Sequence, residues 1–99
     1  MNTFLFLNEL EKIIKDRLQN PKKSSYTNLL AQEGALKIAK KMGEEGVEVS
    51  LASMCENDER LTSEAADLIY HLLVLLAVRG IPFSGVVNEL KKRNKSMNP

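Results

Sequence analysis

Apolar residues recur at three- and four-residue spacing near the start of the chain, which is the period of one helix face. The positions are Leu7, Leu10, Ile14 and Leu18. Asn20-Pro21 disfavours a longer helix, because the residue before a proline is restricted toward extended conformations. We therefore expect a first helix that ends near Gln19, and a loop in which Ser24 or Ser25 is available to cap the next helix.

The helical period resumes at Tyr26, and Gly34 is expected to break or bend the helix. A second apolar stripe follows at Ala35, Ile38, Met42, Val49 and Ala52. Glu45 lies on this stripe, three residues after Met42 and four before Val49. Its side chain is therefore expected to point toward the protein interior.

A third helix is expected after the turn at Asn57-Asp58, with Asp58 as its cap and Gly80 as its stop after about Arg79. Its main stripe is Leu61, Ala65, Leu68, Leu72 and Leu76, and the further apolar residues are Ile69, Leu73 and Leu75. The helix is thus apolar nearly all round. Such a helix is buried at the centre of a domain or in a subunit interface.

The last segment is expected to form a short helix capped by Ser84, followed by a flexible polar tail at residues 94–99. No repeat and no β-type alternation competes with the helical pattern. The chain is therefore predicted to be one all-α domain over residues 1–99, a bundle of four to five helices. A chain of 99 residues buries a modest fraction of its surface, so partner subunits are a plausible further source of apolar burial.

Charge and composition narrow the possible partners. The 14 Lys and Arg nearly balance 13 Asp and Glu, which lacks the basic excess of a nucleic-acid-binding protein. The first ten residues lack a signal-peptide pattern, and Asp67 and His71 interrupt the longest apolar stretch, 65–78, which is shorter than the ~20 residues of a membrane span. A single cysteine, Cys55, fits a reducing compartment. We expect a soluble, cytoplasmic protein without a membrane or nucleic-acid partner.

Two acidic clusters carry the chemical signal: Glu44, Glu45 and Glu48, and then Glu64 with Asp67. Each has helical spacing, and two antiparallel helices joined near residue 57 could bring all five carboxylates around one cavity. Such a cluster is stable only if cations or protons neutralise it. With one His and one Cys in the chain, a Cys/His zinc site is excluded, so Mg²⁺ or Mn²⁺ is the expected metal. It would neutralise phosphate charge and orient a water.

The alternative is that each acidic cluster is a solvated helix face, which is a common pattern and fits Glu44 and Glu48 equally well. Glu45 and Asp67 differ, because each lies among apolar neighbours in the helical projection. A buried carboxylate without a partner is rare, so we expect these two residues to have a function.

Other polar residues could complete a site. His71 follows Asp67 by four residues and could bond to it or share the site, although a lone His on an apolar helix is more often a satisfied core residue. Tyr70 is expected to place its ring in the core, with a partner for its hydroxyl. Two further sets offer donors to phosphates, although surface lysines are usually just solvated. They are Lys37, Lys40 and Lys41, and Arg17 with Ser24, Ser25, Tyr26 and Thr27.

The motif Glu44-Glu45-x-x-Glu48 followed by Glu64-x-x-Asp67 resembles the signature of the MazG-like all-α nucleotide pyrophosphohydrolases, whose carboxylates bind Mg²⁺. Within that superfamily the stretches 25–27, 37–45 and 64–76 resemble the phosphoribosyl-ATP pyrophosphatase family, and the likeness covers nearly the whole chain. Gly46 departs from the alanine expected in the acidic motif and could loosen that turn.

This resemblance implies hydrolysis of the α–β phosphoanhydride of phosphoribosyl-ATP to phosphoribosyl-AMP and pyrophosphate, the second step of histidine biosynthesis. It also implies a homodimer whose helices pack into one bundle. The implied metal ligands are Glu44, Glu45, Glu48, Glu64 and Asp67, of which Glu45 and Glu48 are the catalytic candidates. The candidate substrate-binding residues are Arg17, Ser25, Tyr26, Thr27, Lys37, Lys40, Lys41 and His71.

Two other functions compete with this one. An enzyme of the same fold that hydrolyses (deoxy)nucleoside triphosphates would share the acidic motif. A non-catalytic helical dimerisation module would use Glu45 and Asp67 only for interface salt bridges. Release of pyrophosphate from any nucleotide would separate the dimerisation module from both enzymes.

Overall fold

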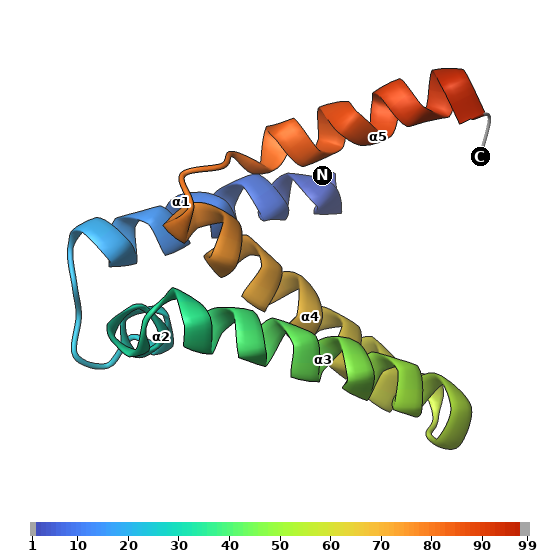
Figure 1. The fold of residues 1–99 in the computed structure, drawn as a ribbon, viewed down its shortest axis with the longest axis horizontal. Helices are drawn as coiled ribbons and strands as arrows, with labels where there is room; N and C mark the ends of the chain where they lie inside the picture. Colours follow the sequence, from blue (N-terminus) through green and yellow to red (C-terminus); the bar gives the residue numbers. More distant parts are fainter. Residues whose placement is uncertain (1, 98–99) are drawn as a thin grey trace.

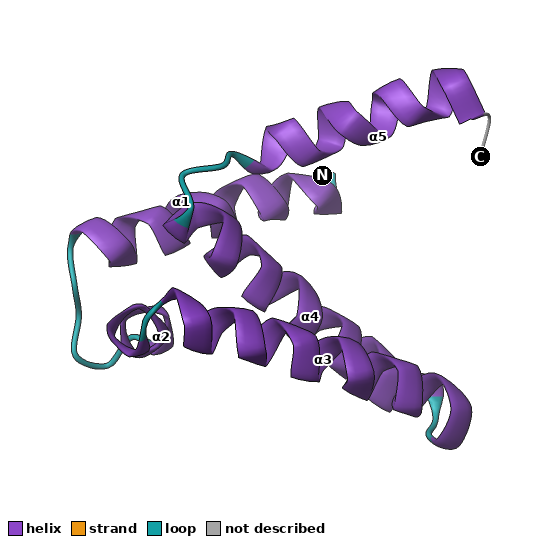
Figure 2. Ribbon diagram, viewed as in Figure 1, coloured by secondary structure: helices purple, strands orange, loops and turns teal. Residues whose placement is uncertain are grey.

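The structure, a computed structural model, describes residues 2–97, and within that range its regular elements are helices joined by loops, without a strand (Figures 1 and 2). A short 3₁₀ turn at Thr3–Leu5 precedes the α-helices. These are α1 (Phe6–Gln19), α2 (Tyr26–Glu33), α3 (Ala35–Cys55), α4 (Asp58–Val78) and α5 (Phe83–Met97). The predicted all-α fold is confirmed, and α1 ends at the predicted residue.

A buried asparagine holds the loop between α1 and α2. The side-chain amide of Asn28 donates to the carbonyl of Arg17, and its Oδ1 accepts from the backbone N–H of Lys22 at 2.5 Å. Ser25 caps α2, as predicted, because its hydroxyl accepts from the N–H of Asn28 at 3.3 Å. The start of α2 is thereby fixed against the end of α1.

Gly34 separates α2 from α3, with φ 94° and ψ 164°. This backbone conformation is open essentially only to glycine, so the predicted break is confirmed. The next connection is a tight turn, and α3 and α4 pack antiparallel along their length (Figure 1). Asn57 caps α4 by accepting from the N–H of Arg60 at 2.8 Å. The prediction of Asp58 as the cap is therefore wrong by one residue, because Asn57 already supplies the acceptor.

The hydrophobic core lies where α1, α2, α3 and α4 meet. Its fully buried side chains are Ile14, Leu30, Ile38, Leu73 and Val74. Leu73 and Val74 come from the second half of α4, so the first half of α4 packs mainly against α3. The carboxylates of the acidic motif lie in that second region, beyond the core.

The start of α5 is tied to α1 rather than capped by its own side chains. The N–H of Phe83 donates to Oε2 of Glu11 at 2.7 Å. The helix therefore begins one residue before Ser84, and the prediction of Ser84 as its cap is wrong. The helix also continues through Met97, because no Gly or Pro interrupts residues 86–97. Residues 94–97 are thus helical rather than a tail, and 98–99 lie outside the described residues.

Many apolar side chains remain on the surface of the single chain. Leu36, Val47, Leu51 and Met54 are all exposed on α3, and their spacing places them on one face of that helix. The helix α4 exposes Ile69 and Val78. The length of α4 and its mean hydropathy of 1.6 would allow it to cross a membrane, but the core helices of soluble proteins can have the same length and hydropathy. It contacts α1 and α3, and 22% of its apolar stretch is buried in the single chain.

Substitutions at Gly34, between two helices, and at Gly46, inside α3, should have opposite effects on stability. Gly34→Ala should lower the free energy of unfolding by about 1–3 kcal/mol, because alanine is strained at a φ of 94°. Gly46→Ala should raise it by about 0.5–1 kcal/mol, because a Cβ at this helical position meets no atom within 4 Å. Urea unfolding at one protein concentration measures both, and a neutral Gly34→Ala would contradict the role given to that glycine.

Candidate functional site

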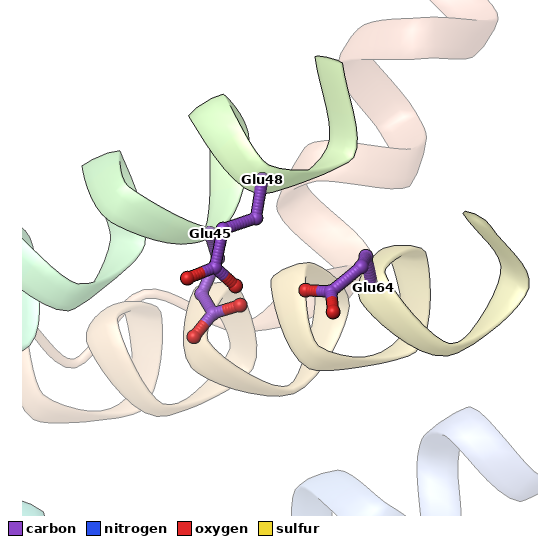
Figure 3. A group of neighbouring side chains, drawn as sticks. All are labelled: Glu45, Glu48 and Glu64. Carbon is purple, nitrogen blue, oxygen red and sulfur yellow. The ribbon is translucent and has the colours of Figure 1, made fainter. Parts of the chain in front are cut away.

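Three carboxylates converge between α3 and α4. Glu45 and Glu48 lie one turn apart on α3, and Glu64 faces them from α4 (Figure 3). One oxygen from each of the three groups lies within 4.8 Å of the others. Antiparallel packing of two helices has therefore joined parts of both acidic clusters, as the sequence predicted.

The three carboxylates differ in burial. Glu64 is only 7% exposed, Glu45 is partly buried, and Glu48 is exposed. Oε2 of Glu45 and Oε2 of Glu64 are buried and have no hydrogen-bond partner among the described residues. Leaving a buried acceptor unsatisfied is costly, and more so when it is charged. The arrangement therefore favours a cation or a proton between the helices.

The electrostatics of Glu64 agree with this. The neighbouring Glu48 carboxyl raises the pKa of Glu64 above that of an ordinary glutamate, and burial and the charge of Asp67 raise it further. Arg60 acts in the opposite direction. Arg60 lies one turn before Glu64 on α4, and its Nη2 donates to Oε1 of Glu64 at 2.8 Å. Without a metal, the charged form of Glu64 is thus disfavoured.

The other two predicted carboxylates lie outside this group. Glu44 is exposed on α3, and Asp67 is exposed on α4. The prediction that Asp67 is buried is wrong for the single chain. Because α4 is apolar nearly all round, its sequence does not reveal which side meets α3, and the structure turns Glu64 rather than Asp67 toward that helix.

A second polar group joins α2 to α4. Nδ1 of His71 lies 2.8 Å from the backbone carbonyl of Asp67, which can only accept, so this nitrogen carries a proton. In the neutral ring, Nε2 then accepts from the hydroxyl of Tyr26 at 3.0 Å. His71 is buried with both nitrogens bonded, which matches a satisfied core histidine. Its hydrogen bond to Tyr26 connects it to the more exposed part of this polar group.

Thr27 and Tyr70 form the other half of this link. The Thr27 hydroxyl hydrogen-bonds the Tyr70 hydroxyl, which confirms the partner expected for that tyrosine. The rings of Tyr26 and Tyr70 stack with centroids 5.9 Å apart, and His71 meets the Tyr26 ring edge-on. Thr27 is buried, whereas the Tyr26 residue is 44% exposed. Among these predicted substrate ligands, Tyr26 is the one that faces outward.

Tyr26 also lies within the electrostatic influence of the carboxylate group. Burial raises the pKa of Tyr26, Lys41 lowers it, and Tyr70 and Glu45 raise it. Lys41 is partly buried, whereas Lys37 and Lys40 are exposed. Of the three predicted lysines, Lys41 is therefore the one whose charge acts on Tyr26.

Arg17 and Ser25 lie at the α1–α2 connection. Arg17 pairs with Asp16 at 2.8 Å, and its carbonyl accepts from the side chain of Asn28. The hydroxyl of Ser25 accepts at the N-terminus of α2. Both residues thus have structural partners in this chain.

Comparison with known proteins decides the family. Residues 7–94 match the family described as phosphoribosyl-ATP pyrophosphohydrolase. The chain belongs to the phosphoribosyl-ATP pyrophosphohydrolase family. The resemblance expected from its acidic motif is thereby confirmed, and so is its link to histidine biosynthesis.

Individual members of the family match nearly the whole chain. It is 53% identical over 89 residues to phosphoribosyl-ATP pyrophosphatase of Metallosphaera sedula, covering 90% of this chain and 96% of that protein. It is 48% identical over 92 residues to the protein of that name from Lactiplantibacillus plantarum, covering 93% and 87%. It is also 48% identical over 93 residues to the histidine biosynthesis bifunctional protein HisIE of Campylobacter jejuni. There it covers 94% of this chain but only 45% of the longer protein.

A cavity of about 430 Å³ adjoins the carboxylates in this family member. It is lined by Glu48, Leu51, Cys55, Glu56, Arg60 and Glu64. Sequence reasoning did not single out Arg60. The signal that could have found it is the four-residue spacing of Glu56, Arg60 and Glu64, which places an arginine between two acids on one helix face.

The raised pKa of Glu64 predicts how metal-free stability depends on pH. Stability should fall as the pH rises from the ordinary glutamate value through the raised pKa, because the folded chain then loses a proton that it holds more tightly than the unfolded chain. Glu64→Gln should remove this loss and raise the melting temperature in EDTA at pH 8. Glu44→Gln is the matched control, since Glu44 is exposed outside the group. An equal rise in both variants would contradict the assignment to Glu64.

Proposed function

We propose that this chain hydrolyses phosphoribosyl-ATP to phosphoribosyl-AMP and pyrophosphate, with a divalent cation held by Glu45, Glu48 and Glu64. Family membership supports the reaction. The observation that supports the metal is the convergence of the three carboxylates within 4.8 Å, with buried oxygens left unpaired.

The donor set fits Mg²⁺, with Mn²⁺ as a substitute. Both cations prefer oxygen ligands, and Mg²⁺–oxygen distances are about 2.1 Å. The three oxygens, which lie within 4.8 Å of one another, would have to move closer together around a bound ion. Glu44 and Asp67 stay candidate ligands, because each lies on the same helix as part of the group. Side-chain rotation or a neighbouring subunit would have to bring them in.

The reaction places definite demands on the chain. When bound, the metal would neutralise phosphate charge and orient a water for attack on phosphorus. Hydrolysis adds one water across the anhydride and releases a proton, so a group of the site has to accept it. Glu45 and Glu48 are the proposed catalytic acceptors, because both lie in the group. Lys41 and Tyr26 are proposed to contact the substrate, since the charges of Lys41 and Glu45 both act on the half-exposed Tyr26.

The proposed reaction takes place in the cytoplasm. Cys55 is a free, exposed thiol, which fits a reducing compartment.

Pyrophosphate release tests the reaction and its metal together. The wild-type chain should release pyrophosphate from phosphoribosyl-ATP far faster than from ATP or deoxynucleoside triphosphates, and EDTA should abolish turnover. Glu45→Gln should fold normally and lose at least about 100-fold in kcat, because a nearly isosteric change removes a charge that the metal needs. The exposed Glu9→Gln on α1 is the control and should keep full activity. Preference for the triphosphates would instead indicate a nucleotide-pool enzyme.

We also propose that the chain acts as a homodimer. The exposed face of α3 formed by Val47, Leu51 and Met54, with Leu36 three turns earlier, supports this, because apolar side chains gathered on one exposed face mark an interaction site. It runs along α3, the helix that carries Glu45 and Glu48. A second copy packed there would cover the patch and would lie close to the carboxylates. Two-fold pairing is the commonest arrangement of such a face.

A charge on this face should separate the subunits. Met54 is 84% exposed in the single chain, so Met54→Glu leaves the core of the chain intact and places a charge in the proposed interface. Light scattering at low micromolar concentration should give twice the chain mass for the wild type and for the control Met54→Leu. Met54→Glu should give a smaller mass or unfold at a lower temperature. A wild type that is active at one chain mass would contradict the dimer.

A further inference from the structure

Among residues 2–97, Arg60 forms the ion pair with the most buried acidic partner. Its partner Glu64 is buried, whereas Glu89, the partner of Arg93 at the same four-residue spacing, is exposed. The Arg60 contact is also shorter, at 2.8 Å against 3.4 Å. A hydrogen bond from a guanidinium to a carboxylate is stronger than one between neutral groups, and removing one partner of a buried carboxylate leaves its charge unpaired.

The rest of Arg60 is held in place as well. Its backbone N–H donates to the side chain of the cap residue Asn57 at 2.8 Å, which fixes it in the first turn of α4. Its Nε lies 3.9 Å from a carboxylate oxygen of Glu56. The guanidinium therefore lies between two acids, along the wall of the cavity beside the carboxylate group.

The two oxygens of Glu64 differ in their hydrogen bonding. Oε1 accepts from Arg60, whereas Oε2 is buried and has no partner among residues 2–97. A cation and Arg60 therefore need not compete for one atom. Ligating carboxylates are typically oriented by hydrogen bonds from residues that do not touch the metal. The guanidinium is half exposed, so solvent screens its repulsion of a cation.

We propose that Arg60 is a positioning residue of the metal site: by holding Oε1 of Glu64, it turns Oε2 toward Glu45 and Glu48. The inference rests on the metal in the proposed function. It assigns a role to a side chain that has no direct contact with the metal. Glu64 without Arg60 would be free to rotate and would also repel Glu48 more strongly, because the guanidinium 2.8 Å from Oε1 offsets part of its negative charge.

Manganese binding, measured by calorimetry without substrate, tests the proposal. Arg60→Gln should raise the Mn²⁺ dissociation constant by about 10- to 100-fold, the usual effect of losing such a support. Arg60→Lys keeps the charge without the planar guanidinium, and its Mn²⁺ dissociation constant should lie between those of the wild type and Arg60→Gln. Arg93→Gln removes the matched exposed pair and should leave Mn²⁺ binding unchanged. Circular dichroism should show the same helix content in all four proteins.

A double-mutant cycle separates an action through Glu64 from a general loss of charge. In a Glu64→Gln background, a further Arg60→Gln change should leave the Mn²⁺ dissociation constant unaltered. Equal or tighter binding by Arg60→Gln alone would overturn the proposal, and so would a second loss in the Glu64→Gln background. A wild type that binds no Mn²⁺ would overturn the proposed metal site itself and this inference with it.

Discussion

Electrostatic repulsion among carboxylates held between two helices is the constraint on which the rest of this structure depends. The antiparallel pair of α3 and α4 forces Glu45, Glu48 and Glu64 together and buries oxygens that no residue in the described part of the chain satisfies. The core formed by Ile38, Leu73 and Val74 anchors one end of this pair. The energy of that packing offsets the repulsion at the site, and a bound cation would relieve it. The carboxylate group therefore destabilises the folded chain locally, and the surrounding hydrophobic packing compensates for this.

The carboxylate group and the hydrogen-bonded aromatic group would have different roles in the proposed reaction. The carboxylates between α3 and α4 offer hard oxygen ligands. The hydrogen-bonded cluster of Tyr26, Thr27, Tyr70 and His71 satisfies its own buried polar atoms and fixes α2 against α4. Tyr26 belongs to the second group but lies within the influence of Glu45 and Lys41. A substrate that spans both groups would meet the carboxylates, with any cation that they hold, at one end and a half-exposed aromatic ring at the other.

Much of this fold follows from local sequence signals. Helix ends are marked by two glycines with positive φ, Gly34 and Gly80, and by Ser25, whose hydroxyl accepts from the N–H three residues later. Interactions between distant segments were not predictable in this way. The cap of α5 by Glu11 joins residues 72 positions apart, and Asn28 bridges the α1–α2 loop through its own buried side chain.

The candidate site was predictable in its chemistry but not in its orientation. The spacing of the acids indicated two clusters on facing helices, and the structure brings three of the five predicted carboxylates together. Asp67 was expected to be buried and is exposed, because an apolar helix gives no sequence signal for the side that meets its neighbour. Arg60 was missed, since a charged pair at helical spacing is ordinary until its partner proves to be buried.

Anomalous diffraction from crystals of the protein grown with Mn²⁺ tests the central claim most directly. The account predicts a strong anomalous peak between α3 and α4, within about 2.3 Å of oxygens from Glu45, Glu48 and Glu64. It also predicts that the peak lies on the Oε2 side of Glu64, with Arg60 still bound to Oε1. A peak at other residues, or none at saturating Mn²⁺, would contradict the assignment of these three carboxylates as the metal site.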